Sequence, residues 1–140
     1  MAETRDLSTA ALAYLGDCVI ELSVREHLVK SGLSHSSSLN RAALDFVRAS
    51  AQSDAVERLL PHLTEEELAF YHRGRNAQHL RFPKNAKPIE YRRATGMEVL
   101  FGYLHAAGRD ERVRELFAVA YPNSQNSRKT EEIDHEKSED

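Results

Sequence analysis

The segment from Ser8 to Lys30 constrains the fold of this chain most strongly. Its apolar residues recur at helical spacing, and Gly32 follows where a C-capping glycine is expected. A chain of 140 residues has room for one domain of ordinary size. The apolar residues that define the spacing are Leu12, Leu15, Val19, Leu22 and Leu28. We therefore predict one domain that begins with a long helix.

The rest of the chain also reads as helices, without a clear strand pattern or an internal repeat. Ser36 to Ser38 offer an N-cap for a second helix, and Thr64 with Glu67 fits a capping box. Pro83, Asn85 and Pro88 interrupt the pattern, so we predict a surface loop over residues 80–89. The further helices are predicted at about 39–60, with a break around 50–53, then from Thr64 to about Gln78, at 91–107 and at 111–120.

The two ends of the chain and its composition restrict the class of protein. No apolar run approaches the roughly 20 residues of a membrane span, and the N-terminus lacks the apolar stretch of a signal peptide. Cys18 is the only cysteine, and the seven histidines show no close metal-binding spacing, which argues against disulfides and zinc. We expect a cytoplasmic protein without a membrane partner, with a domain at 1–122 and a disordered acidic tail at 123–140.

The charge is unevenly distributed. The net charge of −3 is carried by the tail at 123–140, which has six acidic and three basic residues, so the preceding part is neutral. Within that part, residues 71–93 hold seven basic residues against one acidic residue, Glu90. Such a segment is a candidate contact surface for a polyanion, although a basic loop is more often only a solvated surface.

Two carboxylates interrupt apolar helical segments. Asp17 lies between small and apolar residues and follows Gly16, and glycine costs up to about 1 kcal/mol relative to alanine inside a helix. Glu98 repeats this pattern, with Gly96 and Gly102 nearby. A carboxylate and a glycine are both unfavourable inside an apolar helix, so their joint occurrence in each segment suggests a functional reason.

The glycines suggest how the two carboxylates can meet. Gly16 and Gly102 would let two helix backbones approach closely, so that Asp17 and Glu98 converge. Converging carboxylates repel each other unless a cation lies between them or they share a proton. Oxygen ligands supplemented by water and phosphate suit magnesium, which can polarise a phosphoryl oxygen and activate water. Together with the basic segment, this pattern indicates a nuclease.

The sequence also allows purely structural roles for these residues. Asp17 alone has about even odds of being a hydrogen-bonded structural residue, and Glu98 can form a salt bridge with Arg25 or Arg93. Glu21 lies one turn after Asp17 and either joins the site or pairs with Arg25. For Cys18, its helical apolar setting favours a packed thiol over a nucleophile.

Four short motifs, in order, resemble the ribonuclease III family. Residues 11–17 (ALAYLGD) look like its signature helix, and residues 97–104 (MEVLFGYL) look like its second acidic helix. Between them lie residues 73–77 (RGRNA) and 83–85 (PKN), followed by Tyr91 and Arg92. The resemblance spans about residues 7–129 and is closest to the short subfamily, Mini-ribonuclease III, which lacks a double-stranded-RNA-binding domain.

This resemblance implies an all-α, homodimeric fold and a site. Asp17 and Glu98 would be the metal-binding catalytic pair, with Mg²⁺ as cofactor and Mn²⁺ able to substitute. The larger enzymes of the family carry two further carboxylates, at the positions of Ala13 and Thr95 here, and the short subfamily lacks them.

The resemblance also implies a substrate, double-stranded RNA, without a nucleotide cofactor. The expected reaction matures the 5′ and 3′ ends of precursor 23S ribosomal RNA, each protomer cutting one strand. The alternative is a catalytically inert ribonuclease III-like dimer that binds structured RNA or assists ribosome assembly. Because side chains cannot read the narrow major groove of duplex RNA, we expect contacts to phosphates and 2′-hydroxyls. The residues expected to make them are Arg73, Arg75, Asn76, Lys84, Lys87, Arg92 and Arg93.

Overall fold

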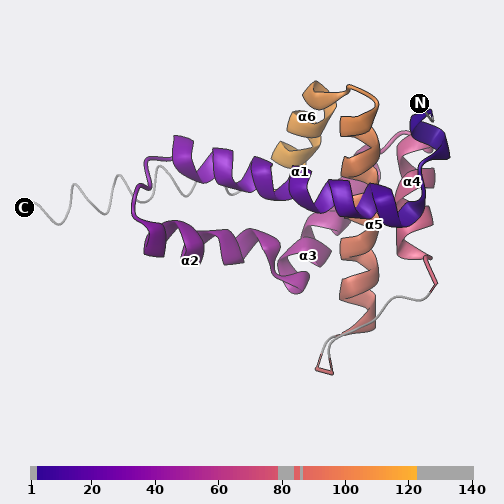
Figure 1. Ribbon diagram of the computed structural model, residues 1–140. Coiled ribbons are helices and arrows are strands. Elements are labelled where there is room, and N and C mark those ends of the chain that lie inside the picture. The colour runs from indigo at the N-terminus through magenta and orange to yellow at the C-terminus, as the bar shows by residue number, and fades with distance from the viewer. Residues whose placement is uncertain (1–2, 79–83, 86, 123–140) are drawn as a thin grey trace, which may run out of the picture.

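The computed structural model describes residues 3–78, 84–85 and 87–122, and within these ranges it contains helices and no strands. The all-α prediction is therefore confirmed, whereas the tail predicted at 123–140 lies outside the described residues. In chain order the elements are a short 3₁₀ turn (Thr4–Asp6), α1 (Thr9–Lys30), α2 (Ser36–Val47), α3 (Ala49–Leu59), a second 3₁₀ turn (Leu60–His62), α4 (Glu65–Arg75), α5 (Pro88–Ala106) and α6 (Asp110–Ala120), as shown in Figure 1.

Two predicted helix starts are present in the structure. The Ser8 hydroxyl accepts a hydrogen bond from the amide of Ala11 at the start of α1. At the start of α4, the Thr64 hydroxyl accepts from the Glu67 amide, and the Glu67 carboxylate accepts from the Thr64 amide. These caps satisfy backbone donors that a helix start leaves without partners.

Three predicted boundaries were wrong. The serines predicted to cap the second helix lie inside the first turn of α2, and His35 occupies the N-cap position without a side-chain hydrogen bond. The break in the second predicted helix falls at Arg48, which is extended (φ −60°, ψ 145°), and residues 50–53 lie inside α3. Ser53 is tolerated there because it is buried and accepts a hydrogen bond from Arg93. The segment between the third and fourth predicted helices also has other bounds than predicted. α4 ends at Arg75, and α5 already begins at Pro88, because a proline at the first helical position needs no amide donor.

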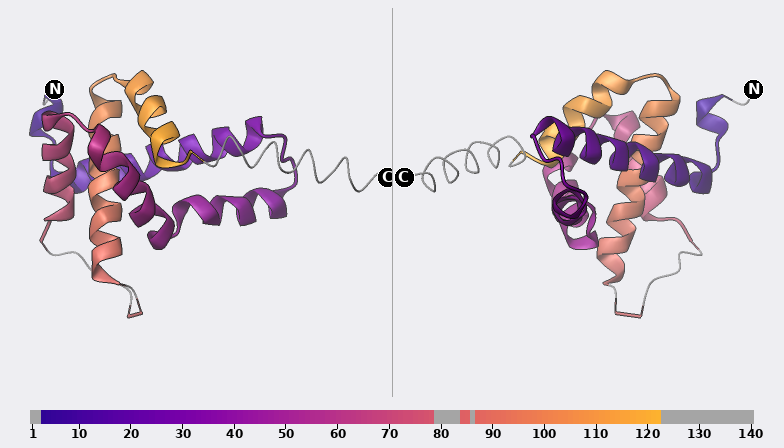
Figure 2. Two further views of the ribbon diagram at one scale, coloured as in Figure 1. Left: turned by 180° about the vertical axis from the view of Figure 1, so that it is seen from behind. Right: turned by 60° about the vertical axis from the view of Figure 1, so that its left-hand side comes forward.

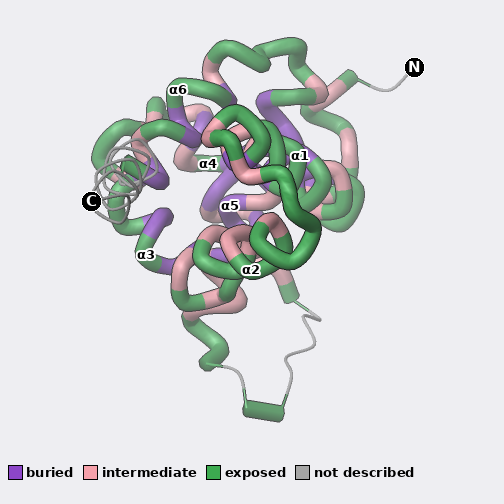
Figure 3. The backbone as a smooth tube through the Cα atoms, turned by 90° about the vertical axis from the view of Figure 1, so that its left-hand side faces the viewer, coloured by how far each residue is buried: buried purple, intermediate pink, exposed green. Residues whose placement is uncertain are grey.

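Helix α5 forms the centre of the molecule. It carries an almost continuous buried run from Met97 to Leu104, in which Glu98 is the one residue that is only half-buried. α1, α3, α4 and α6 pack around it, and the views in Figure 2 show α1 crossing α5 while α4 runs beside it. The buried segments in Figure 3 gather on these helices, whereas α2 contains no buried residue and forms an outer arm with the second half of α1.

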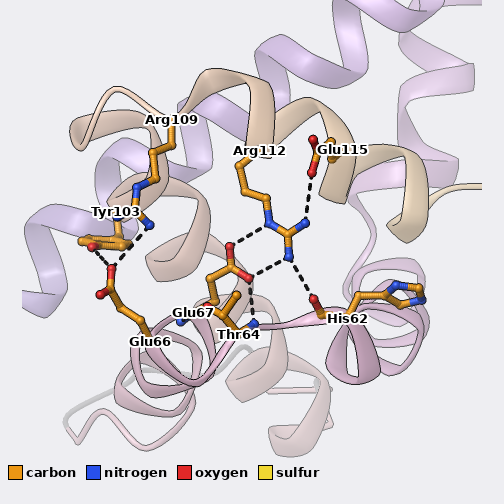
Figure 4. Close-up of polar contacts among 8 residues, drawn as sticks. All are labelled: His62, Thr64, Glu66, Glu67, Tyr103, Arg109, Arg112 and Glu115. Atoms are coloured by element: carbon orange, nitrogen blue, oxygen red, sulfur yellow. Dashed lines mark hydrogen bonds and ion pairs between the residues drawn. The ribbon is translucent and has the colours of Figure 1, made fainter.

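A buried ion pair joins α4 to α6. Glu67 is 2% exposed, and its carboxylate accepts hydrogen bonds from Arg112 Nε (2.8 Å) and Nη2 (2.9 Å), as shown in Figure 4. Arg112 also donates to the carbonyl of His62 and to Glu115. Burial raises the pKa of the Glu67 carboxyl, but the hydrogen bond and charge of Arg112 and the bond from Thr64 outweigh it and hold the pKa below its ordinary value. None of the described helices is long and apolar enough to span a membrane.

Candidate active site

Glycines allow α1 to cross α5 at very short range. A Cβ atom added to Gly16 would overlap the carbonyl oxygen of Glu98 and lie 2.9 Å from the amide nitrogen of Gly102. A Cβ atom added to Gly102 would overlap the carbonyl oxygen of Leu12. The close approach predicted from Gly16 and Gly102 is therefore present, and a larger residue at either position would push the two backbones apart.

The crossing brings Asp17 and Glu98 into electrostatic contact. Asp17 is exposed on α1, and Glu98 is half-buried on α5. Burial and, second to it, the nearby charge of Asp17 raise the pKa of Glu98 from 4.5 to about 7. A carboxyl group in this position resists ionisation near neutral pH unless positive charge is supplied.

No protein group supplies that charge in the described part of the chain. Neither Asp17 nor Glu98 forms an ion pair or a side-chain hydrogen bond there. The alternative in which Glu98 pairs with Arg25 or Arg93 is not observed, since Arg25 binds Glu21 (2.8 Å) and Arg93 binds Ser53 and Glu57.

A divalent cation fits this donor set. The two carboxylates offer hard oxygen ligands and carry repulsion that a cation would relieve. The described residues contain no group of three or more potential ligands, so water and a substrate phosphate would have to complete the coordination. Ala13 and Thr95, which lie one turn before Asp17 and Glu98, are half-buried, and the Thr95 hydroxyl donates to the carbonyl of Tyr91.

Most of the proposed RNA-contacting residues lie where α4 ends and α5 begins. Arg75 is the last residue of α4, and its Nε donates to the side chain of Asn76. Lys84 and Lys87 are exposed, and Lys87 immediately precedes α5. Arg92 lies on the first turns of α5, with Nη1 3.5 Å from the carbonyl oxygen of Arg75. These five residues form what we call the basic end of the α4–α5 pair.

Arg73 and Arg93 differ from the other five because their guanidinium groups donate to side chains on other helices. Arg73 donates to Thr9 and to the carbonyl of Leu7, and its guanidinium lies 5.6 Å from the centre of the Phe70 ring. Arg93 joins α5 to α3 through its bonds to the side chains of Ser53 and Glu57. The sequence does not distinguish these two arginines from the others, since all seven residues lie in one short stretch.

The outer face of α1 carries exposed apolar side chains. Tyr14 is 85% exposed, Leu22 is 55% exposed and Val29 is 62% exposed, on the side of the helix away from α5. Cys18 lies among them and is exposed, so the prediction of a packed thiol was wrong. The physical reason is that α1 has apolar residues on two faces. Cys18 lies four residues from both Tyr14 and Leu22, so it shares their outer face and is exposed with them.

A second glycine crossing was missed in the sequence. A Cβ atom on Gly74 of α4 would lie 2.7 Å from the Thr95 carbonyl oxygen and 2.8 Å from the Cα atom of Gly96. A Cβ atom on Gly96 would lie 2.5 Å from a ring carbon of Tyr71. The signal was available, because Gly74 and Gly96 both lie inside helical patterns, where glycine is unfavourable.

The helical fold agrees with the comparisons to known proteins. Residues 10–109 match the family model described as Ribonuclease III domain. The chain is 43% identical over 120 residues to Mini-ribonuclease 3 of Symbiobacterium thermophilum, covering 86% of this chain and 92% of that protein. It is 45% identical over 113 residues to Mini-ribonuclease 3 of Desulfitobacterium hafniense, covering 81% and 71% of the two chains.

A solved structure shows the same arrangement of helices. The crystal structure of protein FN1578 from Fusobacterium nucleatum superimposes with a TM-score of 0.76 at 26% sequence identity, covering 87% of this chain and 98% of that chain. The chain therefore belongs to the ribonuclease III family, the double-strand-specific endoribonucleases. Within that family it groups with the Mini-ribonuclease 3 proteins.

Proposed function

We propose that this endoribonuclease depends on magnesium and matures the 5′ and 3′ ends of precursor 23S ribosomal RNA in the cytoplasm. The observation that carries the metal dependence is the pairing of Asp17 and Glu98 at a glycine crossing without a protein counter-charge. The ribosomal substrate is supported by the resemblance to the short subfamily. In this proposal residues 1–122 form the catalytic domain, and residues 123–140 form an acidic tail.

Asp17 and Glu98 hold the cofactor in this proposal. When bound, magnesium supplies positive charge that polarises a phosphoryl oxygen and favours attack by water at phosphorus. The contribution of the chain is to hold one carboxylate on each of two helices, whose backbones Gly16 and Gly102 allow into direct contact. The half-buried Glu98 must be ionised to act, and the cation favours that form.

The basic end of the α4–α5 pair is the proposed RNA surface. It presents Arg75, Lys84, Lys87 and Arg92 with the amide of Asn76 at one end of the helix that carries Glu98. Phosphate contacts from such residues position a duplex without reading its sequence, and they make the affinity depend on salt. The other two residues predicted from the sequence, Arg73 and Arg93, are bonded to side chains of neighbouring helices.

The outer face of α1 is the proposed surface of a homodimer. Tyr14, Leu22 and Val29 expose apolar area on the helix that also carries Asp17, and contiguous exposed apolar patches commonly mark protein interfaces. Pairing of two protomers there would place two Asp17–Glu98 sites in one assembly, one for each strand of a duplex. Sedimentation equilibrium should report the mass of two chains, and Tyr14→Glu should shift it to that of one.

A cleavage assay tests the proposed function. Purified protein is incubated with long duplex RNA in magnesium, in manganese and in EDTA, and Asp17→Asn is assayed in parallel. We expect cutting with either metal, none in EDTA, and none by Asp17→Asn, which should still bind RNA and keep its helical circular dichroism. Cutting by Asp17→Asn at the normal rate would refute the site. An inert RNA-binding dimer would bind the duplex without cutting it under any of these conditions.

A further inference from the structure

Arg73 connects two helices that otherwise meet mainly through α5. Its Nε donates to the Thr9 hydroxyl (2.9 Å), and its Nη2 donates to the carbonyl oxygen of Leu7 (2.5 Å). Thr9 is the first residue of α1, and Leu7 precedes the Ser8 cap. The planar guanidinium therefore uses two of its donors, in a fixed geometry, to hold the start of α1 against α4.

This connection completes a triangle of helix contacts. α1 meets α5 at Gly16, and α4 meets α5 at Gly74, the residue that follows Arg73. Arg73 forms the third side, between α4 and the first turn of α1. The close contact of α1 with α5 spans Leu12 to Gly16. The bonds of Arg73 add an attachment two helical turns before Asp17, which restricts rotation of α1 about this crossing.

The same contacts make Arg73 a poor candidate for direct RNA contact. Its side chain is half-buried, its guanidinium lies over the Phe70 ring, and its bonds point toward α1. The guanidinium of Arg75, two residues further along the same helix and also half-buried, donates only to its neighbour Asn76 within the described residues and stands at the basic end of the α4–α5 pair. The two arginines of the same motif therefore have different surroundings.

We infer that Arg73 is a positioning residue, which holds the first turn of α1 against α4 and thereby sets where Asp17 stands relative to Glu98. This inference rests on the proposed roles of Asp17 and Glu98. It assigns Arg73 an effect on the rate of cleavage at saturating RNA and no direct share in RNA affinity. A displacement of catalytic groups by about 1 Å can cost about 100-fold in rate, so a loosened α1 should be measurable.

Four variants test this assignment. Arg73→Ala removes the connection, and Arg73→Lys keeps the charge but lacks the planar fork that reaches both acceptors. Thr9→Val removes one acceptor from the other side without changing the side-chain shape. Arg5→Ala is the matched control, because it breaks an exposed ion pair between the same N-terminal segment and α4 at Glu66. Each is measured for kcat and KM on duplex RNA, for duplex binding in EDTA at several salt concentrations, and for thermal unfolding.

We expect Arg73→Ala and Arg73→Lys to lower kcat by about tenfold or more, with unchanged Kd and salt dependence. Thr9→Val should lower kcat in the same direction by a smaller factor, and Arg5→Ala should match the wild type. If Arg73→Ala does not fold, Arg73→Lys and Thr9→Val still decide the question.

Two results would overturn the inference. One is a wild-type kcat in the Arg73 variants. The other is a weaker Kd with a flatter salt dependence in Arg73→Ala that Arg73→Lys restores, since this identifies a phosphate contact. Both are distinct from failure of the proposed function, in which the wild type does not cut duplex RNA or Asp17→Asn cuts it normally.

Discussion

Glu67 and Glu98 are two glutamates removed from water on neighbouring helices, and their surroundings shift their pKa values in opposite directions. Glu67 is almost fully buried, but Arg112 and the cap of α4 satisfy its carboxylate, and its pKa is lowered. Glu98 is less buried, has no cationic partner within the described residues and faces the charge of Asp17, and its pKa is raised to about 7. Burial alone therefore does not identify a functional carboxylate, whereas burial without compensation does suggest one.

The largest expected effect separates the two glutamates by activity. Glu98→Gln should lower the rate of duplex RNA cleavage by more than about 100-fold, because loss of residues that merely support a metal ligand already costs about 10- to 100-fold. Glu111→Gln, at an exposed glutamate of α6, is the matched control and should cut normally. The rate is measured on long duplex RNA in magnesium, and retention of more than a tenth of the wild-type rate by Glu98→Gln would contradict its proposed role.

The next effect separates them by stability. Glu67→Gln should lower the free energy of unfolding by about 3 kcal/mol, because it leaves the half-buried Arg112 without its main counter-charge. Urea unfolding followed by circular dichroism measures this change, with exposed Glu65→Gln in the same turn as the control. A loss below about 0.5 kcal/mol would mean that the pair behaves like a surface salt bridge.

The third effect is the pH dependence of stability in metal-free buffer. Between pH 4.5 and about 7 the folded state holds a proton on Glu98 that the unfolded state has released, so stability should fall as pH rises through this window. The fall is up to about 3 kcal/mol and should be absent in Glu98→Gln, which is expected to be more stable than the wild type at pH 8.

Glu67 has the opposite sign of pH dependence. Its contribution is complete above its ordinary pKa of 4.5 and is lost as pH falls through its lowered folded value. Thermal unfolding is measured at a series of pH values for the wild type, Glu98→Gln and Glu67→Gln. The loss of stability at acidic pH should depend on Glu67, and the loss of stability as pH rises towards 7 should depend on Glu98. If the wild type and Glu98→Gln lost the same stability as pH rises towards 7, the raised pKa of Glu98 would be contradicted.

The sequence was informative wherever a local rule was broken. Gly16 beside Asp17 and Gly102 near Glu98 violate helix propensity, and both glycines lie at the crossing of α1 and α5. The capping box at Thr64 was also readable, because it depends on residues three apart. The break at Arg48 was not readable, since no proline or glycine marks it and Ser53 gains its hydrogen-bond partner from a distant helix.

By itself the sequence determined the helical class, the long first helix and the acidic pair, because these depend on residue spacing along one or two helices. Tertiary structure alone decided that Arg73 bonds to another helix while the side chain of Arg75 does not, which face of α1 leaves Cys18 exposed, and which glutamate has an arginine as its partner. These outcomes depend on the direction in which side chains point after helices pack, and that direction is set by contacts between residues far apart in the chain.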